Sequence, residues 1–375
     1  MKARTLGYIA RILIYILLLI TVLLVGWYGL PASVHYHLTE SYVFSTSQAN
    51  ASLALAVLLP ESGAYQAVNN VRVSWDGLLE RVAYPALDMY KLQGTVSPAE
   101  PRTATFSYDV ILSQGAARWE APILDYQLLP QVDIESDQPE LVDQARQLTG
   151  GSGRGKVYSI YKFTSSYLHW PSGSRIGGSQ SALAAYQTRI GGCGEFANLM
   201  VALCRADQVP AQSITGLAFP AYPPFWSATR TWNHPAGAHA WVEVFTGERW
   251  EMADPSWVSY FPGSLKRLYF GRSDGSHLSY GEIGQYAQAY AELTAWAEQV
   301  GALVGAMSNP LHFVASSDAE GVTVIPSVTL RKGWDGRWFV VVILYGIMLL
   351  AIRVIENRLK RNRHTTPLPP KELPE

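Results

Sequence analysis

The sequence has few charged residues and almost no cysteine. Charged side chains make up 16% of its 375 residues, against roughly 25% in an average soluble domain. Because hydrophobic residues make up 48%, disorder is excluded and membrane segments are expected. Two cysteines are too few for a disulfide scaffold, so each must serve packing or chemistry.

Several sequence signatures are also missing. We find no phosphate-binding loop, zinc-ligand spacing or dinucleotide fingerprint, and we therefore expect no organic cofactor and no required metal. His35 and His37 lack a Cys, Asp or Glu at ligand spacing, which favours structural roles for both. The formal net charge of -1 gives no overall field for a polyanion, so we expect no nucleic-acid partner.

Two long apolar stretches lie near the ends of the sequence. Residues 12–30 carry no charge and, as a helix, nearly span the ~30 Å hydrocarbon core of a bilayer. This stretch exceeds the ~7 to 15 apolar residues of a cleavable signal peptide. Residues 336–355 predict a second, shorter transmembrane helix, in which Arg353 reaches outward to the interface.

The basic residues beside these spans predict the membrane topology. The positive-inside rule places residues 1–11 and the basic, Pro-rich tail 356–375 in the cytoplasm, and the region between the spans outside it. We therefore expect a two-pass protein of the cell membrane, with the lipid bilayer as a partner. The residues that support this orientation are Lys2, Arg4, Arg11, Arg353, Arg358, Lys360, Arg361 and Arg363, whereas Arg331, Lys332 and Arg337 oppose it.

The region between the spans divides into two parts. Residues 34–130 contain short alternating apolar runs separated by Pro, Gly and Asn, which predicts a β-rich, sandwich-like domain. Helical patterns begin at about residue 136 and open a second domain that extends to residue 333. Near the end of this domain, residues 281–307 have the spacing of an amphipathic helix, and residues 311–330 resemble a β-hairpin.

A cysteine stands at the predicted start of a helix. Gly191, Gly192 and Gly194 bracket Cys193, and apolar residues then recur at helical spacing. The positive end of the helix dipole and the first-turn N–H groups favour a thiolate at this position. Cys193 is therefore placed like a nucleophile. Cys204 lies about 16 Å further along the same helix, too far for a disulfide, and is expected to pack in the core.

A histidine and a carboxylate follow in a predicted hairpin. His239 begins one strand, a turn lies near residues 246–248, and Asp254 ends the next strand. If Phe245 pairs with residue 248 or 249, His239 lies opposite Asp254 or one place beyond it, within reach of a hydrogen bond. Asp254 can then orient the imidazole toward a thiol. His234 is an alternative base, but it lacks such a partner.

Three blocks of the sequence resemble the transglutaminase-like superfamily. They are residues 189–197 (RIGGCGEFA), residues 204–212 (CRADQVPAQ), and residues 239–244 (HAWVEV) with 250–256 (WEMADPS). The resemblance implies an α+β, papain-like transglutaminase core over about residues 137–260, of the membrane-anchored bacterial type. It also implies that Cys193 is the nucleophile, His239 the general base and acid, and Asp254 the orienting residue.

The order Cys, His, Asp predicts an enzyme that transfers acyl groups from amide bonds of proteins or peptides. Attack by water makes it a peptidase or amidase, whereas attack by an amine makes it a transglutaminase, and the sequence leaves both open. Gln187, six residues before the cysteine, is a candidate oxyanion donor. Trp226, Trp232 and Trp241 are candidate walls of the substrate cleft. The alternative is a non-catalytic domain that binds peptides or cell-envelope partners.

Overall fold

The structure is a computed structural model that divides into two compact units. One unit is Ser33–Gly333, and the other comprises the flanking segments Met1–Ala32 and Trp334–Glu375. The residues described are 15–16, 18–21, 32–47, 51–60, 62–63, 65–84, 87–114, 122–148, 151–171, 181–218, 229–232, 238–256, 277–282, 305–308, 322–333 and 342–354.

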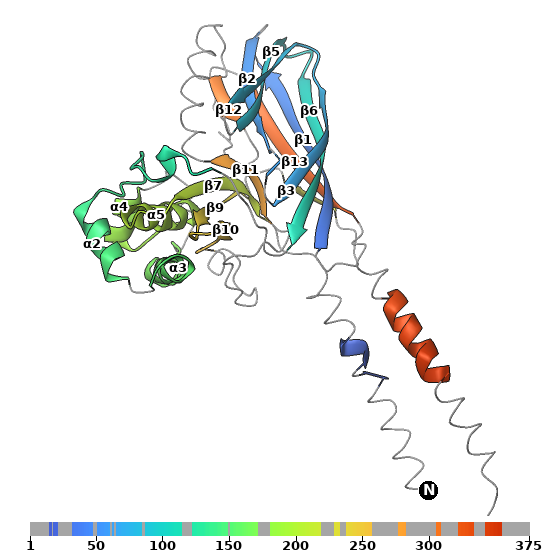
Figure 1. Cartoon of the computed structure of the whole chain (residues 1–375). Coiled ribbons are helices and arrows are strands. Elements are labelled where there is room, and N and C mark those ends of the chain that lie inside the picture. The colour runs from blue at the N-terminus through green and yellow to red at the C-terminus, as the bar shows by residue number, and fades with distance from the viewer. Residues whose placement is uncertain are drawn as a thin grey trace, which may run out of the picture. The chain divides into compact units, whose positions relative to one another are not determined.

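The unit Ser33–Gly333 mixes helices and strands, as the predicted α+β class requires (Figure 1). Its helices are η1 (Asp125–Gln127), α2 (Pro139–Gln147), α3 (Arg154–Tyr167), α4 (Ala182–Thr188) and α5 (Cys193–Ala206). Its strands are β1 (Ala32–Thr46), β2 (Ala51–Leu59), β3 (Gln66–Ser74), β4 (Leu78–Tyr84), β5 (Leu87–Val96), β6 (Arg102–Gln114), β7 (Ala211–Ala218), β8 (Thr229–Trp232), β9 (Ala238–Phe245), β10 (Trp250–Ala253), β11 (His277–Glu282), β12 (Gly305–Ser308) and β13 (Val322–Lys332).

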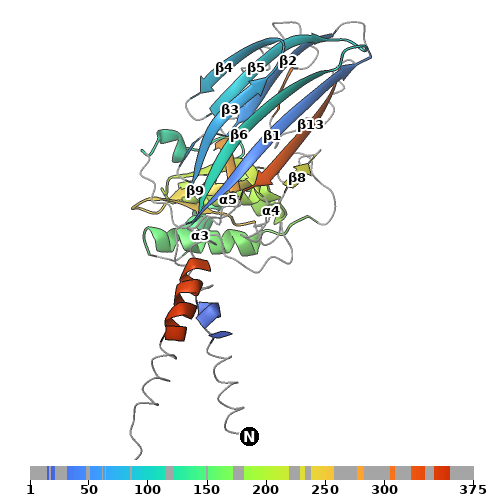
Figure 2. The same cartoon turned by 90° about the vertical axis from the view of Figure 1, so that its right-hand side faces the viewer.

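Two sheets share one hydrophobic core in the β-rich part of the chain. The first has the strand order β3-β6-β1-β13-β8 and the second β12-β2-β5-β4. Alternating apolar side chains of β1, β2 and β6 contribute to the same buried cluster. Figure 2 shows β6, β1 and β13 side by side in the first sheet. Because β8, β12 and β13 complete these sheets, the β-rich part is not confined to the predicted residues 34–130.

A third sheet, with the order β10-β9-β7-β11, carries the second half of the fold. Helix α5 packs against β9 and β7, and α2, α3 and α4 pack against α5. Helix α5 is buried from Glu195 to Arg205, as expected of a helix that is largely apolar all round, and its apolar residues join Ala240, Val242 and Val244 of β9 in a second buried cluster. His239, Trp241 and Glu243 alternate with those residues and therefore lie on the opposite face of β9.

Near the end of this unit the structure corrects the predicted boundaries. The helix predicted over 281–307 is wrong at both ends, because Gly281 and Glu282 belong to β11 and residues 305–308 form β12. β12 pairs in parallel with β2, so a non-local contact outweighs the local helical pattern. Residues 283–304 lie outside the described residues. Of the hairpin predicted over 311–330, residues 322–330 belong to β13, which pairs with β1 and β8.

The predicted membrane spans, 12–30 and 336–355, lie partly outside the described residues. Residues 15–16, 18–21 and 342–354 are helical. Among the residues that the structure describes, no helix is both long enough and apolar enough to cross a bilayer.

A buried carboxylate links the sandwich to the third sheet. Glu40 of β1 accepts hydrogen bonds from Tyr42 at 2.9 Å, from Tyr280 of β11 at 2.8 Å and from Tyr108 of β6. Burial raises the pKa of Glu40 to about 7, although the three tyrosine hydrogen bonds oppose the shift. The strand β11 is therefore tied to the sandwich through a polar network inside the core.

The raised pKa of Glu40 predicts a pH-dependent stability. The folded protein retains a proton that the unfolded chain, with an ordinary pKa of 4.5, releases. The contribution of protonated Glu40 to the free energy of unfolding is fully present below pH 4.5, and it is lost as the pH rises through about 7. As the pH rises from 4.5 to about 7, we expect the free energy of unfolding of Glu40→Gln to increase relative to that of wild type. The increase should be at most ~1.4 kcal/mol for each unit by which the pKa of Glu40 is raised.

Urea unfolding of the full chain at several pH values measures this difference. Glu80→Gln, at an exposed carboxyl group of β4, is the matched control and should show no such change. A constant difference between Glu40→Gln and wild type across the window would contradict the assignment.

Candidate active site

The cysteine predicted as a nucleophile begins helix α5. Cys193 is the first helical residue and is partly exposed. Glu195 receives a hydrogen bond from the Gly192 backbone N–H at 2.7 Å, which fixes the turn before the helix. Gly191 is required there, because a Cβ at this position would collide with the side chain of Glu195. The lack of a side chain at Gly191 therefore leaves room for Glu195, which holds the turn before the thiol.

His239 and Asp254 form a buried pair. His239 Nε2 lies 2.7 Å from Asp254 Oδ2, and both side chains are fully buried. The predicted pairing of the two strands is wrong, because Phe245 pairs with Trp250 and the turn spans residues 246–249. Continued beyond Ala253, this register places Asp254 opposite Trp241. Asp254 thus reaches His239 diagonally along the same face of the sheet.

Two further residues bind the Asp254 carboxylate and were not predicted. Ser256 donates to Oδ1 through its backbone N–H at 3.1 Å and its hydroxyl at 3.0 Å. His277 Nε2 lies 2.9 Å from Oδ2, the oxygen that also faces His239. Ser256 was foreseeable, because a carboxylate commonly binds the backbone two residues on. His277 carries no local sequence signal and reaches the site only through the pairing of β11 with β7.

The positive charge of His239 and the negative charge of Asp254 stabilise each other. Burial alone would lower the pKa of His239, but the charge of Asp254 and hydrogen bonds with Asp254 and Cys193 raise it to about 10. Burial would raise the pKa of Asp254, but the charge of His239 and hydrogen bonds from His239 and His277 hold it well below its ordinary value. At neutral pH the site therefore contains an ionised Asp254 and a protonated His239, whose charge interacts with Cys193.

The same side chains present a possible metal-ligand set. Donor atoms of His239, Asp254 and His277 all lie within 4.8 Å of one another. A divalent ion bound to these atoms would require both imidazoles as neutral ligands and would displace the proton between His239 and Asp254. The structure shows the hydrogen-bonded arrangement, with His239 Nε2 2.7 Å from Asp254 Oδ2.

The structure places the secondary predictions as follows. Gln187 is exposed on α4, and its amide donates to Glu140 at 3.5 Å; its oxyanion role stays a prediction. Trp241 is buried with Tyr65, Ile214 and Met252, which gives it a packing role. Trp226 and the alternative base His234 lie outside the described residues, as does the side chain of Trp232. The substrate-wall roles therefore stay predictions.

Cys204 lies fully buried on α5. Burial raises the pKa of its thiol well above the ordinary value, which makes the thiolate inaccessible at neutral pH. Cys204 is thus a core residue, as its apolar sequence neighbours indicate.

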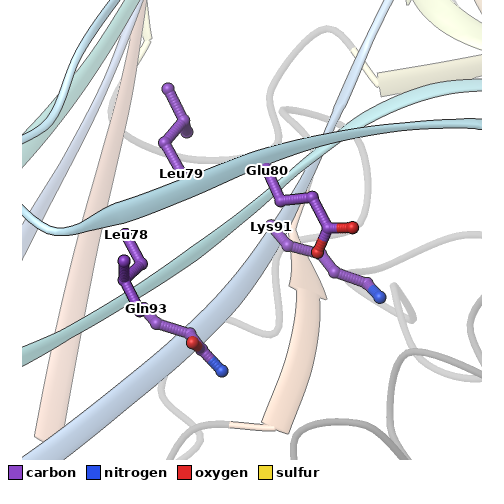
Figure 3. A pocket seen from close by; sticks show the side chains of 5 residues that line it. All are labelled: Leu78, Leu79, Glu80, Lys91 and Gln93. Atoms are coloured by element: carbon purple, nitrogen blue, oxygen red, sulfur yellow. The ribbon is translucent and has the colours of Figure 1, made fainter.

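A pocket on the sandwich lies apart from these groups in the sequence. Its lining residues belong to the adjacent strands β4 and β5, and none of them is Cys193, His239 or Asp254 (Figure 3). The lining residues are Leu78, Leu79, Glu80, Lys91 and Gln93.

Comparisons with known proteins match part of the chain to a protein family and find similar solved structures. Residues 142–255 match a family model described as "Transglutaminase-like superfamily". A candidate cysteine protease from Cytophaga hutchinsonii is 17% identical, with a TM-score of 0.47, over 80% of this chain and 90% of its own. The periplasmic domain of TgpA from Pseudomonas aeruginosa, bound to ethylmercury, is 13% identical, with a TM-score of 0.30. The match covers 62% of this chain and 93% of that domain. No curated protein matches the chain.

Close packing beside His239 predicts the effect of one substitution. Gly216 of β7 pairs with His239, and a Cβ at Gly216 would collide with the Trp241 indole and the Leu278 backbone oxygen. We expect Gly216→Ala to destabilise the fold by roughly 1 to 3 kcal/mol, the usual cost of overpacking. Urea unfolding measures the loss. Gly63→Ala, where a Cβ meets nothing within 4 Å, is the control, and an equal effect at both positions would contradict the explanation.

Proposed function

We propose that the chain, of which residues 142–255 match the transglutaminase-like superfamily, is a thiol acyl-transfer enzyme acting on amide bonds of proteins or peptides. Cys193 is the nucleophile, His239 the general acid and base, and Asp254 the residue that orients His239. The observation that carries this proposal is the buried His239, which contacts Asp254 through Nε2 at 2.7 Å and interacts with Cys193.

The electrostatics prepare the first step of the reaction. An imidazolium with a pKa of about 10 stabilises a thiolate on Cys193, and the positive end of α5 adds to this effect. The partial exposure of Cys193 leaves its sulfur accessible to a substrate. Asp254 remains ionised and balances the positive charge on His239 in a site from which water is largely excluded.

The covalent chemistry follows from these charges. The Cys193 thiolate attacks the amide carbonyl carbon, and negative charge develops on the carbonyl oxygen, where the Cys193 backbone N–H is the candidate donor. The carbon–nitrogen bond then breaks, His239 gives its proton to the leaving amine, and a thioester forms. Water or a second amine attacks the thioester, His239 accepts the proton, and the thiolate leaves. The acceptor determines whether the product is hydrolysed or crosslinked.

We also propose that the enzyme is held in the cell membrane, with both termini in the cytoplasm and the catalytic part outside. The uncharged stretch 12–30 and the basic residues beside the stretches 12–30 and 336–355 support this topology. Apolar side chains exposed along the helical residues 342–354 also support it, because such surfaces favour lipid over water. These side chains include Val342, Ile343, Leu344, Ile347 and Leu350.

The interaction of Cys193 with the protonated His239 predicts rapid alkylation at neutral pH. We expect iodoacetamide to label Cys193 of the full chain well below the ordinary thiol pKa of ~8.5. His239→Ala should slow the labelling at pH 7 by about tenfold or more, because an unassisted thiol is only a few per cent ionised there. Mass spectrometry of the labelled peptides identifies the cysteine and measures the rate.

Two controls accompany the labelling. Cys193→Ala should abolish the fast phase, and the buried Cys204 should remain unlabelled until the protein unfolds. Labelling that follows an ordinary thiol titration, with no effect of His239→Ala, would contradict the enzymatic proposal and favour a domain that only binds peptides or cell-envelope partners.

A further inference from the structure

A second imidazole shares the carboxylate oxygen that faces His239. His277 Nε2 lies 2.9 Å from Asp254 Oδ2, while His239 Nε2 lies 2.7 Å from the same atom. The side chain of His277 is 1% exposed, so water cannot replace this hydrogen bond. A buried polar group held in this way lowers the energy of one arrangement relative to its alternatives.

We propose that His277 is a positioning residue, which fixes the Asp254 carboxylate so that Asp254 holds His239 against Cys193. This inference rests on the proposed function, because it assigns His277 to the same catalytic group. The carboxylate receives two donors on each oxygen, with Ser256 on Oδ1 and the two imidazoles on Oδ2. Hydrogen bonds at both oxygens fix the plane of the carboxylate, and without His277 only His239, the residue to be positioned, would hold Oδ2.

The strand that carries His277 is itself held by the sandwich. Gln66 of β3 bonds Ser279 twice, with its Nε2 donating to the backbone oxygen and its Oε1 accepting from the backbone N–H, both at 2.7 Å. Tyr280 donates to the buried Glu40 at 2.8 Å. Two consecutive residues of β11 therefore contact the β-rich part of the chain, which places His277 by packing and hydrogen bonds outside the matched segment 142–255.

A purely structural role for His277 makes a different prediction. Its ring packs edge-on against Trp241, with ring centroids 5.1 Å apart. If packing were its role, leucine would replace it better than glutamine, because leucine buries no polar group. If donation to Asp254 is its role, glutamine should replace it better, because the glutamine amide retains an N–H donor. The two roles thus rank the same pair of variants in opposite order.

The first experiment compares His277→Leu and His277→Gln in the full chain. The readout is the rate of Cys193 alkylation by iodoacetamide at pH 7, measured with a chelator present so that no metal contributes. We expect His277→Leu to slow alkylation about tenfold or more, as misplacement of a catalytic group does, and His277→Gln to recover most of the rate. Equal rates, or a faster reaction of His277→Leu, would overturn the inference.

A second experiment does not depend on catalysis. The urea midpoint is measured for wild type, His277→Leu, Asp254→Asn and the double variant. The shift caused by His277→Leu should be smaller in the Asp254→Asn background, where its charged partner is absent. Additive shifts would overturn the inference. Coupled shifts together with an ordinary Cys193 thiol would uphold the contact of His277 with Asp254 and reject the proposed function instead.

Discussion

The buried, ionised Asp254 carboxylate is the constraint on which the site depends. A buried charge must be surrounded by donors, and removal of one partner of such a pair typically costs about 3 to 5 kcal/mol. The donors come from β9, from the residues after β10 and from β11. The strand order β10-β9-β7-β11 therefore brings the three donor segments to one carboxylate.

The geometry of Cys193 depends on a different local device. The absence of a side chain at Gly191 leaves room for Glu195, and Glu195 holds the turn before α5 through the Gly192 N–H. Helix α5 then packs on β9 and β7, the sheet that also carries His239. Cys193 begins the helix that packs on β9, and His239 lies on β9 itself, so the contact between α5 and this sheet brings the two residues near enough to interact.

Local sequence patterns indicated Cys193, His239 and Asp254 as candidate site residues. A glycine-flanked helix start and a hairpin can each be recognised from residues close together in the sequence. The strand register was wrong because the four-residue turn closed by Thr246 and Arg249 has one or two residues more than expected. His277 lies 23 residues after Asp254 and meets it only through β7, so no local pattern indicates the contact. The strand β12 was mistaken for helix because its pairing with β2 is equally non-local.

The pairing of β1 with β13 has a mechanical consequence. Tyr36 lies opposite Lys332, and the Gly333 N–H donates to the His35 carbonyl at 2.7 Å, so the chain enters and leaves this unit at neighbouring points. A pulling force applied at both ends would load the hydrogen bonds of this antiparallel pair one after another, from Gly333 inward, rather than all together. This pair is therefore loaded in the order in which it unzips, so the unit should yield at a lower force when its two ends are drawn apart than if the same bonds were sheared together.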